Sequence, residues 1–347
     1  MTTPLLTLDP ERAEIYADRD AWLAGRKAGE ARIGASLVHK ILDAPWEALE
    51  ILTGQAPAHD AATLRAFARG HRWERMVIDE YAAVREVSAQ PIGDALGSPG
   101  ALVIARHATE AWAVSSPDAA VADPHAGAGL VECKTDAGGR GWAEADCEIR
   151  TADDFHLSIA PAAYVAQTYW QMETTGLPFV DLVCLLPRYA LRVVRVWADP
   201  AFQRELLDTV GAWRERHVLR GEPLPVDGSD ACTRAIVRRF PGSADKALRE
   251  ATSDEAGDVL AYVAAKAVIK EYEAKADELR NRILASIGDG YGVTLPTGGK
   301  LLSIPTKGRE TVSLSEIAKA DPELSARLAP HVHVGAPSRQ VRTYGID

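Results

Sequence analysis

Two short motifs carry residue types that could perform metal-dependent hydrolysis. One is a Ser-Pro-Asp motif that ends at Asp118, and the other is a Glu-Cys-Lys motif from Glu132 to Lys134. In a β-strand, residues i and i+2 project from the same face, so Glu132 and Lys134 should point together while Cys133 faces the other side. A proline is tolerated at the end of a strand, and we expect Asp118 to end the preceding strand. If the two strands are neighbours, two carboxylates and one ammonium converge.

This set of groups is the one that phosphodiester hydrolysis requires. Carboxylate oxygens are the ligands that Mg²⁺ prefers. A bound metal ion lowers the pKa of an attacking water and neutralises charge on the reacting phosphate, and a lysine beside it adds a fixed positive charge. A Glu-x-Lys triplet alone is common on surface strands as an ordinary ion pair. The interpretation as a hydrolytic site therefore depends on Asp118 and on further residues.

Glu74 is the first of these further residues. Helical periodicity predicts a helix over residues 61–84, in which Glu74 lies on the same face as Val77. A carboxylate on an apolar face needs a partner or a metal ion, because an isolated buried charge is costly. Either Arg72 or Arg75 could also provide that partner, in which case Glu74 has only a structural role.

Gln167 is the second residue that supports the interpretation as a hydrolytic site. It lies in a predicted helix over residues 161–175, where Tyr164, Gln167 and Gln171 share one face. A glutamine amide can hydrogen-bond a phosphate or a metal-bound water. A simple contact between helices is the alternative for this face.

The elements that would position these residues alternate between helices and strands. Besides the two helices above, the patterns predict helices over residues 11–30, 33–52 and 200–219. Short apolar runs separated by turn residues predict strands over residues 102–104, 111–114, 130–134, 181–186 and 191–197. This order indicates an α/β fold with a central mixed β-sheet flanked by helices.

A segment rich in Pro and Gly over residues 221–229 predicts a linker. We therefore expect a first domain over residues 1–228 and a C-terminal extension over residues 229–347. The extension contains a long amphipathic helix, predicted from residue 254 to 287, and a small β element.

Composition and charge narrow the classes of protein to which the chain can belong. The formal net charge of −10 argues against histone-like DNA binding but leaves room for a local basic groove beside a metal site. The four cysteines form no Cys-x-x-Cys pair, which argues against a zinc ribbon or an iron–sulfur cluster. We find no signal peptide, membrane-spanning stretch or phosphate-binding loop of an ATPase, so we expect a cytoplasmic enzyme that needs no ATP.

Taken in order, several motifs resemble the lambda exonuclease and YqaJ-like viral recombinase group of the PD-(D/E)XK nuclease superfamily. The resemblance extends from about Trp22 to Leu219. It rests on Trp22, Arg26, Ile33-Gly34-Ala35-Ser36, Gly70-His71-Arg72-Trp73-Glu74, Ser116-Pro117-Asp118, Glu132-Cys133-Lys134 and Tyr164-Val165-Ala166-Gln167. It implies a restriction-endonuclease-like core for the first domain.

The resemblance also implies roles for individual residues. The metal ligands of the family correspond to Asp118 and Glu132, with Glu74 and the backbone carbonyl of Cys133 beside them. The catalytic lysine corresponds to Lys134.

Further residues correspond to the DNA-binding part of such a site. The active-site glutamine of the family corresponds to Gln167. The arginine and serine that lie near the 5′ phosphate correspond to Arg26 and Ser36, with Arg32 as the alternative arginine. Ser116 and Tyr164 would also face the DNA.

By the same resemblance, the enzyme degrades one strand of linear double-stranded DNA from a 5′ end with Mg²⁺, for which Mn²⁺ substitutes, and without ATP. Such enzymes act in phage-type recombination beside a single-strand annealing protein of the RecT or Bet type, and they form homo-oligomers, commonly trimers. The alternatives are an endonuclease on the same fold and an inert DNA-binding accessory protein.

Overall fold

The computed structural model describes residues 6, 8–9, 11–27, 31–136, 138–139, 141–157, 159–242, 248–296, 298–305 and 313–331. The chain divides into two compact units, Met1–Ala235 and Ile236–Asp347. The predicted domain boundary at residue 228 lies close to this division. All of the predicted site residues belong to the first unit.

The centre of the first unit is a mixed six-stranded sheet. Its strand order is β3-β6-β7-β9-β10-β8. Strand β7 pairs in parallel with β9, and β10 pairs in parallel with β8, while the other neighbours are antiparallel. The strands are β3 (Ser88–Pro91), β6 (Ala119–Asp123), β7 (Gly127–Thr135), β8 (Cys147–Ile149), β9 (Phe179–Leu185) and β10 (Leu191–Trp197).

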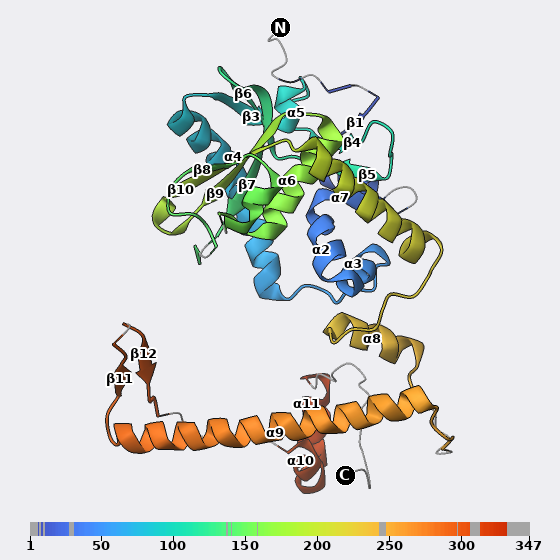
Figure 1. The fold of residues 1–347 in the computed structure, drawn as a ribbon, viewed down its shortest axis with the longest axis vertical. Coiled ribbons are helices and arrows are strands. Elements are labelled where there is room, and N and C mark those ends of the chain that lie inside the picture. Colours follow the sequence, from blue (N-terminus) through green and yellow to red (C-terminus); the bar gives the residue numbers. More distant parts are fainter. Residues whose placement is uncertain are drawn as a thin grey trace. The chain divides into compact units, whose positions relative to one another are not determined.

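Helices cover both faces of this sheet (Figure 1). On one face, α4 (Ala61–Arg85) packs Val77 and Ile78 against Val131 of β7. On the other face, α6 (Ala162–Thr175) packs against Leu130, and α7 (Pro200–Trp213) packs on α6. Because both faces are covered, every residue of β9 is buried, as is usual for an inner strand of a sheet that has helices on both faces.

Local sequence explains where these two covering helices begin and end. The side chain of Asp60 accepts a hydrogen bond from the Thr63 N–H and caps the start of α4. Glu86, with φ of 53°, ends that helix in the left-handed region. Gly176 ends α6 with φ of 76°, a conformation that glycine adopts without steric penalty.

A four-stranded sheet with the order β1-β4-β5-β2 completes the first unit. Its strands are β1 (Ala13–Tyr16), β2 (Ile33–Gly34), β4 (Leu102–Arg106) and β5 (Ala113–Ser115). The remaining helices of this unit are α1 (Arg19–Lys27), α2 (Val38–Asp43), α3 (Pro45–Leu52) and α5 (Ile92–Ala95), and the short turns are η1 (Ala35–Leu37), η2 (Ala152–Leu157), η3 (Pro187–Tyr189) and the π-helical η4 (Arg214–Leu219).

The predicted α/β fold with a flanked central mixed sheet is confirmed, and so are the helices that carry Glu74 and Gln167. The prediction of one helix over residues 11–30 is wrong, because residues 13–16 form β1 and only residues 19–27 are helical, while residues 28–30 lie outside the described residues. The predicted helix over residues 33–52 is also broken. It divides into β2, η1, α2 and α3, with Pro45 at the start of α3.

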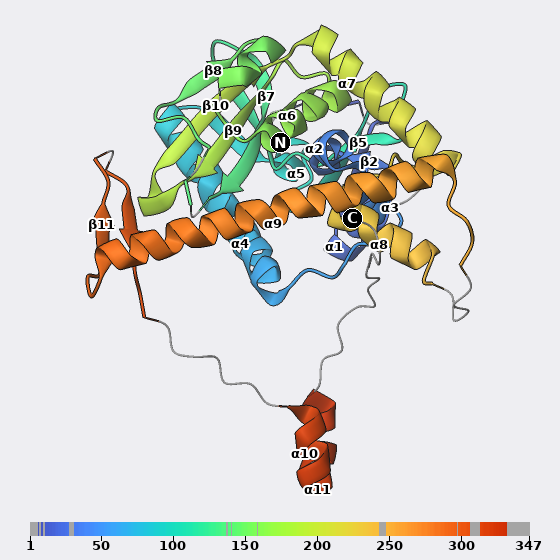
Figure 2. The same ribbon diagram turned by 60° about the horizontal axis from the view of Figure 1, so that its bottom comes forward.

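The second unit is dominated by α9 (Ser253–Ile287), which confirms the predicted long helix and runs without a break in Figure 2. Thr252 and Glu255 form a reciprocal capping box at its start. The helix α8 (Asp230–Arg239) spans the division between the units. The other elements are β11 (Gly292–Thr294), β12 (Lys300–Leu302), α10 (Leu314–Ala320), α11 (Pro322–Leu328) and η5 (Ala329–His331). Among the helices described, none has the length and apolar composition that crossing a bilayer requires.

Candidate active site

Glu132 and Lys134 lie on the same face of β7, as their spacing predicts. The Lys134 Nζ atom lies 2.5 Å from Glu132 Oε1. Glu132 is almost fully buried, and the Lys134 side chain keeps 18% of its surface exposed. Strand β7 is therefore not a surface strand whose charged face is solvated. The two residues form a charged pair enclosed between β7 and α6.

The helix α6 encloses this pair with two amides. Gln167 donates from Nε2 to Glu132 Oε1 at 2.5 Å and accepts a hydrogen bond from Lys134 Nζ at 3.1 Å. Gln171, one turn further along, donates from Nε2 to Glu132 Oε2 at 2.6 Å. The Lys134 Nζ atom also lies 4.8 Å from the centre of the Tyr164 ring, a cation–π contact. The shared face of these helix residues is thus directed at the carboxylate, which decides against the alternative of a plain contact between helices.

Asp118 joins the site from an element that differs from the prediction. It does not end the strand over residues 111–114, because β5 belongs to the other sheet. It lies just before β6, a strand the sequence patterns did not predict, and β6 pairs with β7. The Asp118 Oδ2 atom accepts a hydrogen bond from the Cys133 N–H at 2.7 Å, and this contact holds the carboxylate beside the Glu132–Lys134 motif.

The electrostatics of Asp118 show how crowded the site is with negative charge. Burial, reinforced by the charges of Glu132 and Glu74, raises the pKa of Asp118 well above its usual range. The ammonium of Lys134 and the Cys133 N–H act in the opposite direction but do not offset the rise. A carboxylate in this position is stabilised in its charged form by an additional cation.

Glu74 approaches the same site from α4. Its side chain is 35% exposed, and its Oε2 atom lies 3.5 Å from His71 Nδ1. Burial raises the pKa of Glu74, and the charge of Glu132 adds to this effect against the opposing influence of His71. Among the described residues, neither Arg72 nor Arg75 forms an ion pair with Glu74. Arg75 pairs with Asp79 and Asp94 instead.

The donor set suits a hard divalent cation. Asp118, Glu132 and Glu74 supply carboxylate oxygens, and their mutual repulsion is only partly neutralised by Lys134. Within the residues that the structure describes, no group of three or more His, Cys, Asp or Glu side chains is already close enough to hold a metal ion. The chemistry of the donors therefore fits a hard divalent cation.

The two candidate arginines have different surroundings. The Arg26 guanidinium lies 4.8 Å from the centre of the Trp22 ring and donates from Nη2 to the Ser36 hydroxyl at 3.4 Å. Arg32 instead forms a two-pronged ion pair with Glu14, with both N–O distances at 2.8 Å. Arg26 and Ser36 thus lie together as predicted, whereas the charge of Arg32 is already used inside the fold.

The remaining predicted residues lie close to the same motifs. Ser116 is half-buried, two residues before Asp118, and Ser36 is exposed in the middle of η1. The Cys133 thiol is directed toward the α4 side of the sheet, where it packs with Val131. Burial raises the pKa of this thiol well above its usual range, so it stays protonated.

Sequence reasoning did not assign a site role to Gln171, Arg19 or His71. Arg19 Nη2 lies 2.9 Å from His71 Nε2, which extends the row of polar contacts from Glu74 and His71 to α1. The signal for Gln171 was available, because it follows Gln167 by four residues on one helical face. No local signal relates Arg19 to His71, since the two residues are 52 positions apart.

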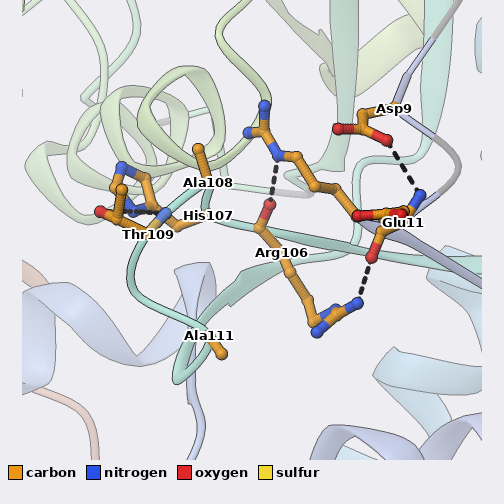
Figure 3. Close-up of a pocket in the computed structure, with 8 residues that line it drawn as sticks. Asp9, Glu11, Arg106, His107, Ala108, Thr109 and Ala111 are labelled. Atoms are coloured by element: carbon orange, nitrogen blue, oxygen red, sulfur yellow. Dashed lines mark hydrogen bonds between the residues drawn. The ribbon is translucent and has the colours of Figure 1, made fainter.

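A separate pocket of about 640 Å³ lies between the N-terminal segment and the turn after β4. Figure 3 shows Asp9, Glu11 and His107 along this pocket, and Arg12 donates to the backbone carbonyl of Arg106. None of the predicted site residues lines it. It is therefore distinct from the candidate active site.

The comparisons with known proteins concern mainly the first unit. Residues 21–178 match the sequence model of a family described as the YqaJ-like viral recombinase domain. No curated protein matches the chain.

Solved structures that resemble the chain include the alkaline exonuclease LHK-Exo from Laribacter hongkongensis, with a TM-score of 0.41 and 20% identity over 57% of this chain and 91% of that chain. The same enzyme in complex with dAMP has a TM-score of 0.41 and 21% identity over the same shares of the two chains. The protein SSO0001 has a TM-score of 0.28 and 15% identity over 56% of this chain and 85% of that chain.

Proposed function

We propose that this protein is a Mg²⁺-dependent DNA exonuclease, because residues 21–178 match the sequence model of the YqaJ-like viral recombinase domain. The predicted family, and with it the enzyme class, is confirmed by the match. The proposed substrate is linear double-stranded DNA, degraded from 5′ to 3′ without ATP to yield single strands for phage-type recombination. The observation that carries the proposal is the convergence of Asp118, Glu132 and Lys134 from β7 and the chain before β6.

In this proposal Asp118 and Glu132 hold Mg²⁺, assisted by the Cys133 carbonyl and by Glu74. A bound Mg²⁺ would lower the pKa of an attacking water and neutralise charge on the reacting phosphate. Mn²⁺, which accepts the same oxygen ligands, should substitute. The crowded carboxylates support this assignment, since a divalent cation would relieve the repulsion that adds to burial in raising the pKa of Asp118.

Lys134 has the properties of a fixed positive charge. Burial acts to lower its pKa, but the charges of Glu132 and Asp118 outweigh burial and raise it. Beside these two carboxylates the side chain is therefore held as an ammonium. It would donate hydrogen bonds to the reacting phosphate or to the attacking water, held in place by Gln167 and by the Tyr164 ring.

We assign recognition of the 5′ end to Arg26 and Ser36. Their side chains are already in contact, and the Arg26 guanidinium is the cation of that pair. Burial lowers the pKa of Arg26, and the charge of Glu132 opposes this effect, so Arg26 lies within electrostatic reach of one proposed metal ligand. Ser116 and Tyr164 would contact the DNA strand beside the reacting phosphate.

The proposed setting follows from the family resemblance of the domain. The protein would act in the cytoplasm, where its free cysteines stay reduced. It would work as a homo-oligomer, with a trimer as the expected form, beside a single-strand annealing protein of the RecT or Bet type. A ring would allow processive cleavage without ATP, because a threaded product strand cannot easily leave.

The proposal is tested with purified protein, Mg²⁺ and no nucleotide. The substrates are linear duplexes labelled at the 5′ or the 3′ end and a covalently closed circle, each with an EDTA control. We expect early loss of the 5′ label, slow loss of the 3′ label and an intact circle. Cleavage of the circle would support an endonuclease, and no cleavage of any substrate would support an inert DNA-binding protein.

A further inference from the structure

The donors around the Glu132 carboxylate are divided unequally between its two oxygens. Oε1 accepts hydrogen bonds from Lys134 at 2.5 Å and from Gln167 at 2.5 Å. Oε2 accepts a hydrogen bond only from Gln171, at 2.6 Å, among the described residues. A carboxylate has about four lone-pair sites, two on each oxygen. Oε1 is therefore saturated, and the remaining site lies on Oε2.

We infer that Gln171 is a positioning residue that holds Glu132 so that the remaining lone pair of Oε2 faces a divalent cation. This inference rests on the proposed function and adds to it. Glu132 would bind the cation through one oxygen, because the other oxygen is occupied by Lys134 and Gln167. Gln171 would fix which oxygen that is by preventing the carboxylate from rotating.

The environment of Gln171 does not suggest an ordinary packing role. The residue is fully buried, and its Oε1 atom has no hydrogen-bond partner. Leaving a buried polar atom unpaired costs about 1–3 kcal/mol, a penalty that an apolar side chain of similar size would avoid. Within the described residues, the only side-chain hydrogen bond that Gln171 makes is the one to Glu132. The polar group at this position therefore serves that carboxylate.

Gln203 in α7 offers a matched control within the same unit. It is 5% exposed, it donates from Nε2 to Glu173 Oε2 at 3.2 Å, and its Oε1 atom also lacks a partner. Glu173 pairs with His107, away from the proposed metal ligands. The two glutamines thus match in burial and hydrogen bonding and differ in the carboxylate they contact.

The test compares full-length wild type with Gln171→Met and Gln203→Met. We would measure Mn²⁺ affinity by electron paramagnetic resonance without DNA, thermal unfolding without metal, and kcat and KM on linear duplex in Mg²⁺. For Gln171→Met we expect Mn²⁺ binding about tenfold weaker and kcat about 10–100-fold lower, the usual range for residues that orient metal ligands. The KM for DNA should not change. Gln203→Met should lose similar thermal stability and keep both the Mn²⁺ affinity and kcat.

Equal Mn²⁺ affinity in wild type and Gln171→Met would overturn the inference while leaving the proposed function intact. If Gln171→Met does not fold, Gln171→Asn replaces it, since this variant keeps the amide but withdraws it from Glu132 by one methylene, and the same loss of affinity is expected. A wild-type protein that binds no Mn²⁺ and cuts no DNA would overturn the proposed function together with this inference.

Discussion

Arg26 and Arg32 illustrate how the partners of a residue decide its role. Arg26 contacts Ser36 and the Trp22 ring and has no carboxylate partner among the described residues, whereas Arg32 is bound by both oxygens of Glu14. A guanidinium bound in this way is unavailable to a phosphate. The motif alone left both arginines as candidates, and the structure favours Arg26.

We predict that Arg26→Ala raises the KM for 5′-phosphorylated linear DNA about tenfold, since a hydrogen bond to a charged group contributes about 1.5–3 kcal/mol. The KM for ends that carry a 5′ hydroxyl should change little. Arg32→Ala should lower the melting temperature and leave the preference for a 5′ phosphate unchanged. Kinetics on both kinds of end, with thermal unfolding, check this assignment. It fails if Arg32→Ala abolishes the preference and Arg26→Ala does not.

Residue spacing predicted the pairs that lie close in sequence. Glu132 and Lys134 follow from the two-residue repeat of a strand, and Gln167 follows from the helical repeat. The partners of Arg26 and Arg32 could not be predicted in this way. Glu14 reaches Arg32 only because the segment predicted as one helix over residues 11–30 contains a strand, and no local pattern indicates that pairing.

At the scale of elements, a buried ion-pair network joins three strands and a helix on the α4 side of the sheet. Arg195 of β10 binds both oxygens of Asp181 of β9 at 2.7 Å and lies 2.9 Å from Asp123 of β6. The Tyr81 hydroxyl of α4 donates to Asp181. This network lies on the sheet face opposite Glu132 and Lys134, and it joins the two strands that flank β7.

We predict that Arg195→Met lowers the free energy of unfolding by about 3–5 kcal/mol, because it leaves a buried carboxylate unpaired. The control is Arg150→Met, which removes an exposed ion pair with Glu148 and should change stability by less than about 1 kcal/mol. Urea unfolding monitored by circular dichroism measures both. Equal losses in the two variants would contradict the importance of the network.

The same network predicts a dependence of stability on acidic pH. Burial acts to raise the pKa of Asp123, but hydrogen bonds from the backbone N–H groups of Ala126 and His125 and from Arg195 outweigh it and lower the pKa to about 2. A carboxyl whose pKa is lower in the folded state stabilises the fold above its unfolded pKa of about 4. This stabilisation should decline as the pH falls from about 4 to 2.

Urea unfolding of wild type and Asp123→Asn across this range measures the effect. We expect the loss of stability toward low pH to be smaller in Asp123→Asn. Parallel curves for the two proteins would exclude Asp123 as a source of the dependence.

Long, strongly periodic elements were predictable, and short ones were not. The helices over residues 61–85, 162–175 and 253–287 agree with the patterns because each repeats over several turns. Strand β6 was missed because three of its five residues, Ala119-Ala-Val-Ala-Asp123, are alanine, which is depleted in strands and gives no apolar–polar alternation. Because β6 was not predicted, Asp118 was assigned to the end of the preceding strand, whereas it lies directly before β6.

In the whole molecule, the proposed catalytic residues all lie before Ala235, while α9 and the elements after it belong to the second unit. Contacts concentrate within each unit, so we predict that limited proteolysis cuts first between α8 and α9. Mass spectrometry should identify an N-terminal fragment that ends between residues 239 and 253. A first cut inside the six-stranded sheet would contradict the division into these two units.

In the proposed function, Asp118, Glu132, Glu74 and Lys134 form one hydrolytic site, and the variant Lys134→Ala is the most direct test of that site. Single-turnover cleavage of end-labelled linear duplex in Mg²⁺ should fall by at least about 10²-fold, the loss typical for one transition-state donor. The Kd for the same duplex in Ca²⁺ should stay near that of the wild type, because most of the DNA affinity comes from phosphate contacts elsewhere. A Lys134→Ala protein that cleaves at nearly the wild-type rate would contradict the site.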